Sequence, residues 1–180
     1  MREIEKLPLL LILGPSGTGK TTVLKRLLRR DNPCILIDAD TFWRTEFNAP
    51  ETNFIEFKRY CLKIAIHISQ NGFPIVYFLQ GVPDDFKKCR EASSFSQIHY
   101  LFLVCDEENL ISRLHRKPKG WGLLERNPNH IDDILQYNKL LKDLAQQHDI
   151  PMIDTSKSSI EEVSEEVYKW ILSTIATDTF

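Results

Sequence analysis

The residues whose types and spacing most clearly allow chemistry lie at positions 14–21, where the sequence reads GPSGTGKT. This run fits G-x-x-x-x-G-K-[ST], the pattern of a loop whose glycines let backbone N–H groups wrap around phosphate groups. In such a loop the lysine, here Lys20, reaches the β- and γ-phosphates of a nucleoside triphosphate, and the hydroxyl of Thr21 can coordinate Mg²⁺. The predicted triphosphate-binding residues are Gly14, Pro15, Ser16, Gly17, Thr18, Gly19, Lys20, Thr21 and Thr22.

The segments on either side of this loop have the patterns that its chemistry requires. Residues 7–13 form a short apolar run, typical of a buried strand, and residues 22–30 place valine and leucine side chains at helical spacing. A helix that starts directly after the loop points the positive end of its dipole at a bound anion. We therefore interpret the loop as a nucleotide site and not as a glycine-rich turn.

Two carboxylates, Asp38 and Asp40, follow the second predicted strand, 34–37. In open α/β sheets ligands bind at the carboxyl ends of the strands, so both acids should lie near the triphosphate. Since they stand two residues apart on an extended chain, their side chains should point to one side. We expect Asp38 to lie nearer the Mg²⁺ ion and Asp40 to hold or deprotonate the hydroxyl of a second substrate. The alternative is that Asp40 or Thr41 caps a helix that begins near Phe42.

The exit of the third predicted strand carries Gln80, where an ATP-driven motor would normally carry an acidic residue. This difference argues against a motor protein. The Gln80 amide can contact a second substrate, so we include it among the substrate-binding candidates. Asp84 and Asp85 follow closely, and we interpret both as caps of a helix N-terminus, where acidic side chains are favoured.

Arg113 and Arg116, after the fourth predicted strand, lie three residues apart and therefore share one face of a predicted helix. Positioned arginines stabilise the charge on a phosphoryl group during its transfer, so we expect both to be catalytic, with Arg113 also contacting the nucleotide. The alternative is that they only complement the helix dipole. Residues 117–129, rich in glycine, proline and cations, are predicted to form a lid with Arg126 as a substrate-binding candidate; an ordinary surface connection is the other interpretation.

An aromatic cluster occupies the segment between the second and third predicted strands. Part of it must belong to the core, but this segment would also cover the second substrate, where a ring such as Trp43 can stack on a planar molecule. Arg44, beside that ring, can bind an anionic group, so both residues are substrate-binding candidates. The cluster consists of Phe42, Trp43, Phe47, Phe54, Phe57 and Tyr60.

The bulk properties limit the class of protein. A chain of 180 residues, 42% hydrophobic and 27% charged, suits one globular domain over residues 1–180. The formal net charge of −2 provides no basic field for nucleic acid, and it gives no indication of the oligomeric state. No apolar run is long enough to span a bilayer, no signal-peptide pattern is visible, and the cysteines lack metal-binding spacing. We expect a cytoplasmic protein with reduced thiols and no membrane or nucleic-acid partner.

The elements that must position these residues follow an alternating pattern. Short apolar runs alternate with longer amphipathic segments, which is typical of a parallel α/β sheet. The predicted strands span residues 9–13, 34–37, 75–79, 99–104 and 151–153. The predicted helices span residues 20–30, 51–71, 83–92, 107–116, 129–148 and 160–175.

Taken in order, these features resemble the P-loop small-molecule kinases, a group that includes shikimate, gluconate, adenylylsulfate and nucleotide kinases and chloramphenicol phosphotransferase. The motifs that carry the resemblance are the P-loop, the D-x-D pair at 38–40, the paired arginines before a lid, and the loop 154–157 after the last strand. The resemblance implies an α/β fold of the P-loop NTPase kinase type. It has three layers, a five-stranded parallel sheet in the order 2-3-1-4-5, helices on both faces and a small lid.

The resemblance also implies roles for residues and cofactors. ATP with Mg²⁺ would be the phosphoryl donor. Asp40 would bind the acceptor and serve as the base, Asp38 would lie near the magnesium ion, and Arg113 and Arg116 would flank the lid. Thr155 would contact the nucleotide from the loop that packs on adenine.

The subfamily is not indicated, because Gln80-Gly81 replaces the glycine-rich motif of shikimate kinase and Gly120-Trp121-Gly122 matches only part of the gluconate kinase lid signature. The leading hypothesis is an ATP-dependent kinase for a small-metabolite acceptor, such as a nucleoside, a nucleotide or a sugar-like compound. The alternative is a P-loop ATP-binding protein or NTPase without small-molecule kinase activity. A regulatory GTPase is disfavoured, because the run NKLL at 138–141 lacks the aspartate of N-K-x-D. The near-neutral charge disfavours a polynucleotide kinase.

Overall fold

The computed structural model describes residues 6–116 and 130–178. Five parallel strands form one sheet in the order β2-β3-β1-β4-β5, which confirms the predicted topology. Each predicted strand is present within one residue of its expected limits. The strands are β1 (Leu9–Leu13), β2 (Ile35–Asp38), β3 (Ile75–Leu79), β4 (Ile98–Val104) and β5 (Met152–Asp154).

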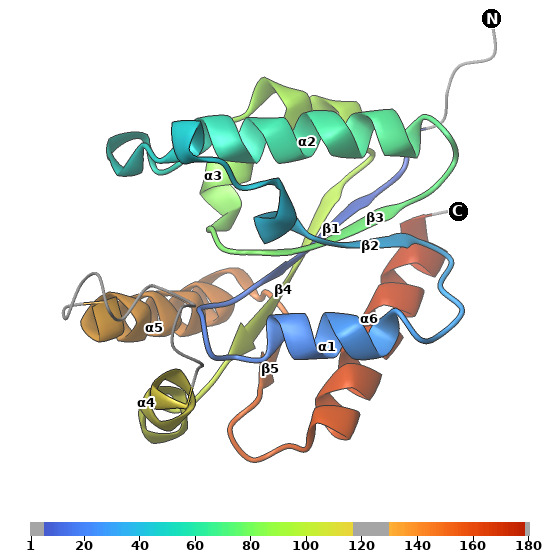
Figure 1. The fold of residues 1–180 in the computed structure, drawn as a ribbon. Helices are drawn as coiled ribbons and strands as arrows, with labels where there is room; N and C mark the ends of the chain where they lie inside the picture. Colours follow the sequence, from blue (N-terminus) through green and yellow to red (C-terminus); the bar gives the residue numbers. More distant parts are fainter. Residues whose placement is uncertain (1–5, 117–129, 179–180) are drawn as a thin grey trace, which may run out of the picture.

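Helices connect the strands and cover the sheet (Figure 1). The α-helices are α1 (Lys20–Leu27), α2 (Ile55–Ser69), α3 (Pro83–Lys87), α4 (Glu107–His115), α5 (His130–His148) and α6 (Ile160–Asp178). Four short 3-10 helices join them: η1 (Ala39–Phe42), η2 (Thr45–Phe47), η3 (Pro50–Thr52) and η4 (Arg90–Ser94). Within the described ranges, no helix combines the length and the apolar character needed to cross a membrane.

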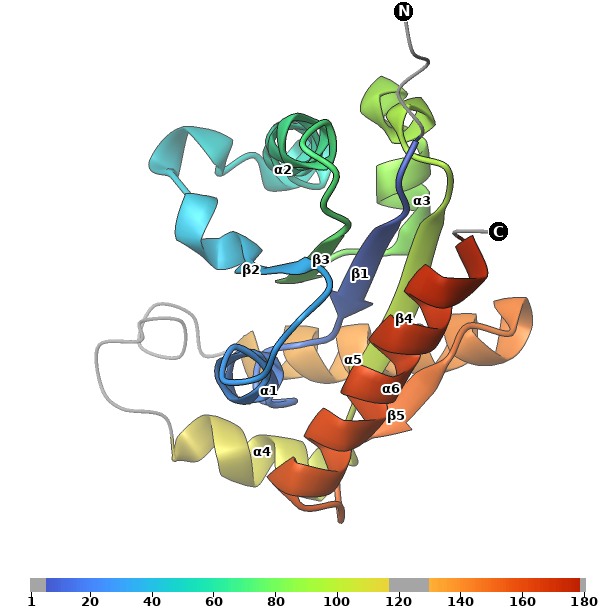
Figure 2. The same ribbon diagram turned by 90° about the vertical axis from the view of Figure 1, so that its right-hand side faces the viewer.

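The core lies on both faces of the sheet, and alternate residues of the central strand β1 point to opposite layers. Leu9, Leu11 and Leu13 pack with residues of α2, α3 and α5, whereas Leu10 and Ile12 pack with residues of α1 and α6. Figures 1 and 2 show α1 and α6 on one side of the sheet and α2 and α3 on the other. Since β1 and β3 are fully covered on both faces, they appear in the sequence as continuous apolar runs.

The segment between β2 and α2 differs from the prediction. It contains η1, η2 and η3, and α2 begins at Ile55 instead of residue 51. Asn53 and Phe54 have φ angles of 53° and 55°. These left-handed conformations cannot continue a right-handed helix, so the predicted helix 51–71 is shorter than expected.

Two further predictions of local structure need correction. The predicted helix 83–92 is divided into α3 and η4, because Cys89 between them has an extended backbone with φ −80° and ψ 128°. The cap of the turn after β2 is Asp38, which accepts a hydrogen bond from the backbone N–H of Asp40, so Asp40 and Thr41 are not the caps. The other helices agree with their predicted limits to within three residues.

Candidate functional site

A cavity of about 710 Å³ lies at the carboxyl edge of the sheet, where the sequence places the candidate residues. Its walls come from the loop after β1, the first turns of α1, the exits of β2 and β3, α4, and the loop between β5 and α6. The cavity is lined by Pro15, Ser16, Gly17, Thr18, Gly19, Lys20, Thr21, Thr22, Lys25, Asp40, Gln80, Arg113, Thr155, Ser158, Ile160 and Val163. Its volume is within the range of small-molecule and cofactor sites.

The loop between β1 and α1 depends on glycine at two positions. A Cβ atom at Gly14 would lie 2.5 Å from the carbonyl oxygen of Leu103 in β4, so the backbone of the loop can approach the sheet only without a side chain. Gly19 has a φ of 91° and directly precedes α1, a left-handed conformation that glycine adopts without strain. The buried Thr18 hydroxyl tightens the loop by donating to the carbonyl of Pro15 over 2.9 Å.

The ammonium group of Lys20 lies inside the curve of this loop. It donates hydrogen bonds to the carbonyl oxygens of Gly14, at 2.6 Å, and Pro15, at 3.1 Å. The lysine is therefore already oriented along the loop that would enclose phosphate groups, at the N-terminal end of α1, where the helix dipole favours an anion.

The structure brings Thr21 and Asp38, the two residues that the sequence suggested as magnesium ligands, into contact. The Thr21 hydroxyl donates to Oδ2 of Asp38 over 3.2 Å, and Oδ1 of the same carboxylate accepts from the N–H of Asp40. A hydroxyl and a carboxylate fit Mg²⁺, which prefers oxygen ligands and keeps several of its waters. The described residues contain no group of three or more acidic, histidine or cysteine side chains that could hold a metal ion.

Asp40 and Gln80 both line the cavity opposite the triphosphate-binding loop. Asp40 lies in η1 and not on an extended chain, so its side chain and that of Asp38 do not share one direction as the sequence suggested. Asp38 contacts Thr21, whereas Asp40 faces the cavity. The loop after Gln80 is fixed by Tyr137 of α5, whose hydroxyl donates to the carbonyl of Gly81 and accepts from its N–H.

Trp43 and Arg44 lie beside the cavity and are not among the residues that line it. The Trp43 ring is 43% exposed and packs against other rings of its segment. Arg44 donates a hydrogen bond to the hydroxyl of Tyr60 over 2.7 Å. Trp43 and Arg44 follow Asp40 closely in the chain, and rings of the aromatic cluster fix the positions of both side chains.

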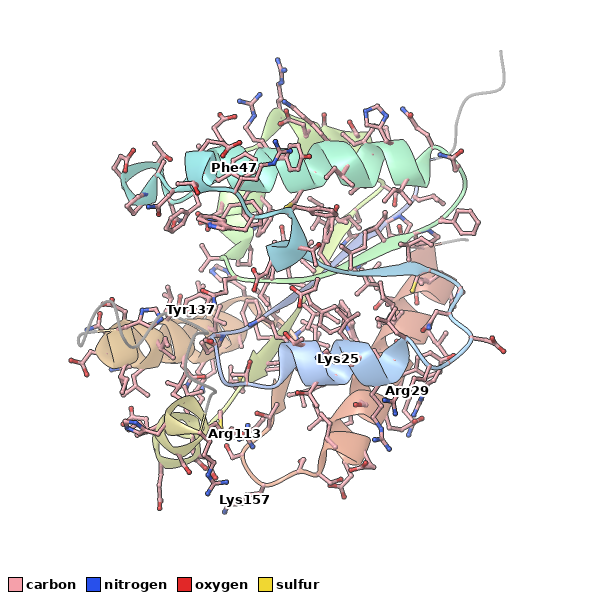
Figure 3. All side chains as sticks on the ribbon, in the orientation of Figure 1. Lys25, Arg29, Phe47, Arg113, Tyr137 and Lys157 are labelled. Carbon is pink, nitrogen blue, oxygen red and sulfur yellow. The ribbon has the colours of Figure 1, made fainter. Side chains whose placement is uncertain are left out.

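The two predicted arginines, Arg113 and Arg116, have different environments. Arg113 lines the cavity and donates to the hydroxyl of Thr155, at 2.9 Å, and to its carbonyl oxygen. Figure 3 shows Arg113 on α4 near the loop that carries Lys157. Arg116 is exposed at the C-terminal end of α4 and does not line the cavity. Arg126 and the predicted lid at 117–129 lie outside the described residues.

Sequence reasoning missed four residues of the cavity wall. Lys25 lies four residues after Thr21 on α1, and this helical spacing, within the basic end of α1, could have identified it. Ser158, Ile160 and Val163 belong to the loop after β5 and the first turn of α6. The sequence gives little indication that these residues line a cavity, since an isoleucine and a valine three residues apart are also typical of an ordinary core-facing helix.

Comparisons with known proteins give matches only among solved structures. No protein-family model matches the chain, and a search of curated proteins also found no match. A gluconokinase from Sinorhizobium meliloti matches with a TM-score of 0.67 at 14% identity, covering 98% of this chain and 97% of its own. A sugar kinase from Janibacter matches with a TM-score of 0.64 at 16% identity, covering 96% of each chain. Shikimate kinase from Acinetobacter baumannii matches with a TM-score of 0.61 at 20% identity, covering 95% and 96%.

These matches define the class of fold. The chain has the kinase-type P-loop fold, and its structural neighbours include sugar, shikimate, gluconate and deoxyadenosine kinases. At these identities the likeness extends to the fold alone, and no subfamily is distinguished.

Proposed function

We propose that the protein is an ATP-dependent phosphotransferase that moves the γ-phosphoryl group of ATP, with Mg²⁺, to a hydroxyl group of a small-molecule acceptor. The observation that carries this proposal is that the triphosphate-binding loop and Asp40 line one cavity. A donor site and a group able to accept a hydroxyl proton are thereby held within reach of each other. The fold shared with small-molecule kinases supports the same reaction class.

In the proposed reaction, a bond forms between the acceptor oxygen and the γ-phosphorus, and the bond to the oxygen that leaves with ADP breaks. Asp40 accepts the hydroxyl proton as the acceptor oxygen attacks. Lys20 exchanges the carbonyl oxygens that it now contacts for oxygens of the β- and γ-phosphates. Bound by Thr21 and Asp38, Mg²⁺ would neutralise charge on the same phosphates.

Arginine side chains stabilise the charge that spreads over the transferred group. Arg113 is the first candidate, because it lines the cavity and Thr155 holds its guanidinium group. Arg116 remains a candidate for the same role, and Arg126 a candidate for binding the acceptor, both on the basis of the sequence.

The two ends of the cavity suit the two substrates. Thr155 and the wall formed by Ser158, Ile160 and Val163 would hold the nucleoside part of ATP, since this wall combines polar and apolar side chains. The acceptor would bind at the opposite end, where the candidates are Asp40 and Gln80 together with the neighbouring Trp43 and Arg44.

The state of the thiols supports a reducing compartment, and we propose the cytoplasm. Cys34, Cys61, Cys89 and Cys105 are all buried and unpaired. Burial raises the pKa of Cys34 to about 11, which keeps that thiol neutral at physiological pH.

The test is ADP release in the presence of ATP and Mg²⁺ across nucleosides, nucleotides, sugar acids and hydroxylated antibiotics. The parent protein should release ADP only with an acceptor. Asp40→Asn should lower this rate by roughly 10²–10⁴-fold with ATP binding intact, since a general base contributes that much. The matched control is Asp84→Asn, which changes an exposed carboxylate outside the cavity.

Two results would contradict the proposal. Full activity of the Asp40→Asn variant would exclude this carboxylate as the base. Steady ADP release that no acceptor increases would indicate an NTPase and not a kinase.

A separate control tests the donor site. The Lys20→Ala variant should lose ATP binding measured by calorimetry.

A further inference from the structure

The aromatic cluster contains one exposed residue, Trp43, that packs against buried and partly buried rings. The Trp43 ring lies 5.1 Å from that of Phe57, 5.7 Å from that of Phe54 and 6.4 Å from that of Phe47, measured between ring centroids. Phe57 is buried, while Trp43 keeps 43% of its surface exposed. Figure 3 shows Phe47 beside the N-terminal end of α2. Because three neighbouring rings pack against the indole at tilted or edge-to-face angles, its orientation is fixed before any ligand binds.

This exposed ring lies beside the proposed catalytic carboxylate. The N–H of Trp43 donates to the carbonyl of Asp40 over 3.1 Å, which closes the 3-10 turn at the end of η1. Trp43 directly follows η1 as its C-terminal cap, so Asp40 and Trp43 lie at the two ends of one backbone hydrogen bond. Burial, and next the charge of Asp40, raise the pKa of Cys61 on α2 to about 12.

The nearby cations of α2 are already neutralised by carboxylates. Lys58 is buried and donates to Oδ2 of Asp85 and to the carbonyl of Asn53, each over 2.6 Å. Arg59 forms ion pairs with Glu91, at 3.2 Å, and with a second glutamate one turn before it on the helix. An anionic ligand would have to displace these carboxylates to pair with Lys58 or Arg59.

Arg44 contacts two rings of the aromatic cluster, those of Phe47 and Tyr60. Its guanidinium group donates to the Tyr60 hydroxyl and lies 5.0 Å from the centroid of that ring and 5.8 Å from that of Phe47. Glu46 lies 3.7 Å from the same guanidinium. Arg44 therefore fixes two members of the aromatic cluster, and its charge is shared with Glu46.

Backbone donors at the exit of β3 are occupied as well. The N–H of Gly81 donates to the Tyr137 hydroxyl over 2.8 Å, and the N–H of Val82 donates to Asp85 over 3.1 Å. At this end of the cavity the side chain of Gln80 offers an amide, which both donates and accepts. Such a group suits a hydroxyl or a carbonyl better than a carboxylate or phosphate.

On the basis of the proposed function, we propose that the acceptor is an uncharged hydroxyl compound with a flat aromatic or heteroaromatic ring. The ring stacks on Trp43, the hydroxyl to be phosphorylated meets Asp40, and Gln80 contacts a polar substituent. The observations that carry this choice are the supported indole next to Asp40 and the internal pairing of Lys58, Arg59 and the N–H groups after Gln80. They favour nucleosides and aromatic alcohols over sugar acids and nucleotides.

The test uses matched pairs of ligands that differ in one charged group. One pair is a nucleoside and its 5′-monophosphate, and another is an aromatic diol and the corresponding carboxylic acid, each tested with several ring systems. Binding is measured by calorimetry in the presence of ADP and Mg²⁺, and turnover by ADP release from ATP. In each pair the uncharged member should bind at least 10-fold more tightly.

Substitutions at position 43 test whether acceptor binding depends on the Trp43 ring. Trp43→Ala should weaken acceptor binding roughly 10-fold or more, as expected for a lost stacking partner, with the affinity for ATP unchanged. Trp43→Phe should keep most of the binding. Phe73→Ala is the matched control, because Phe73 is 50% exposed in the loop between α2 and β3, outside the aromatic cluster.

The outcomes separate the two proposals. Tighter binding of the charged members, or no binding of any uncharged one, overturns the inference about the acceptor whether or not ADP is released. An unchanged affinity in the Trp43→Ala variant overturns it too. Binding of uncharged members through Trp43 without phosphoryl transfer supports the inference and contradicts the proposed kinase reaction.

Discussion

The hydroxyl of Thr21 donates a hydrogen bond to Oδ2 of Asp38 over 3.2 Å. Thr21 lies in the first turn of α1, and Asp38 ends β2, a strand separated from β1 by β3. The Thr21 hydroxyl, from the helix after β1, and the Asp38 carboxylate, from the end of β2, are thus held together beside the loop 14–19. In the proposed function these two oxygen groups would bind the magnesium ion that accompanies the nucleotide.

Substitution of Asp38 should therefore change the magnesium dependence. We predict that Asp38→Asn raises the Mg²⁺ concentration needed for half-maximal ADP release by roughly 10-fold or more, because a charged oxygen ligand is replaced by a neutral amide. Thr21→Ser should keep the parent value, since it keeps the hydroxyl. Titration of ADP release with Mg²⁺ at saturating ATP measures the effect, and an unchanged dependence in Asp38→Asn would rule out this ligand.

The second prediction separates the two arginines of α4. Arg113→Ala should lower turnover by roughly 10²-fold, since it removes a positioned donor, and it should also weaken ATP binding. Arg116→Ala should bind ATP like the parent, because Arg116 is exposed and does not line the cavity. Steady-state kinetics and calorimetry distinguish the two variants, and equal losses of ATP affinity would contradict the assignment.

The third prediction concerns stability. Lys58 and Asp85 form an ion pair of 2.6 Å whose side chains are 4% and 9% exposed. Replacing either partner alone, as in Lys58→Met or Asp85→Asn, should cost about 3–5 kcal/mol of unfolding free energy, because a buried charge is left without its partner. Urea denaturation of both single variants and the double variant forms a double-mutant cycle.

An exposed pair nearby provides the control for this cycle. Lys87 and Asp84 lie 3.6 Å apart with side chains 66% and 75% exposed. Their separate replacement should change stability by only about 0–1 kcal/mol, because water screens the interaction. Similar losses at the two pairs would show that the burial of Lys58 and Asp85 does not govern their contribution.

The sequence predicted the sheet and the glycine-rich loop between β1 and α1 because both depend on local patterns. The apolar runs of β1 and β3 and the glycine spacing before Lys20 can be recognised within a few residues. The sequence also placed Asp38 near the triphosphate-binding candidates, since strand ends meet at one edge, and in the structure Asp38 contacts Thr21.

The contacts that sequence reasoning missed join residues far apart in the chain. Asp85 was interpreted only as a cap, and it does accept from the N–H of Val82, but its main partner Lys58 is 27 residues away. Tyr137 and Gly81 are 56 residues apart. Such pairs depend on how α2, α3 and α5 pack on the sheet, and no periodicity in the sequence encodes that distance.

The fourth prediction concerns acid sensitivity, through the contact between Glu91 of η4 and Arg59 of α2. Burial acts most strongly and raises the pKa of Glu91, but the hydrogen bonds from Arg59, a backbone hydrogen bond and the charges of Arg59 and Arg90 together outweigh it, so the net pKa is lowered from its ordinary value of 4.5. The fold therefore favours the ionised carboxylate. Its contribution to stability is present above pH 4.5 and is lost as the pH falls through the lowered pKa.

Urea denaturation between pH 7 and pH 3 should show a smaller acid-induced loss of unfolding free energy for Glu91→Gln than for the parent. Glu166→Gln, an exposed change on α6, serves as the control and should follow the parent curve. Equal slopes for Glu91→Gln and the parent would exclude this carboxylate as a source of the acid sensitivity.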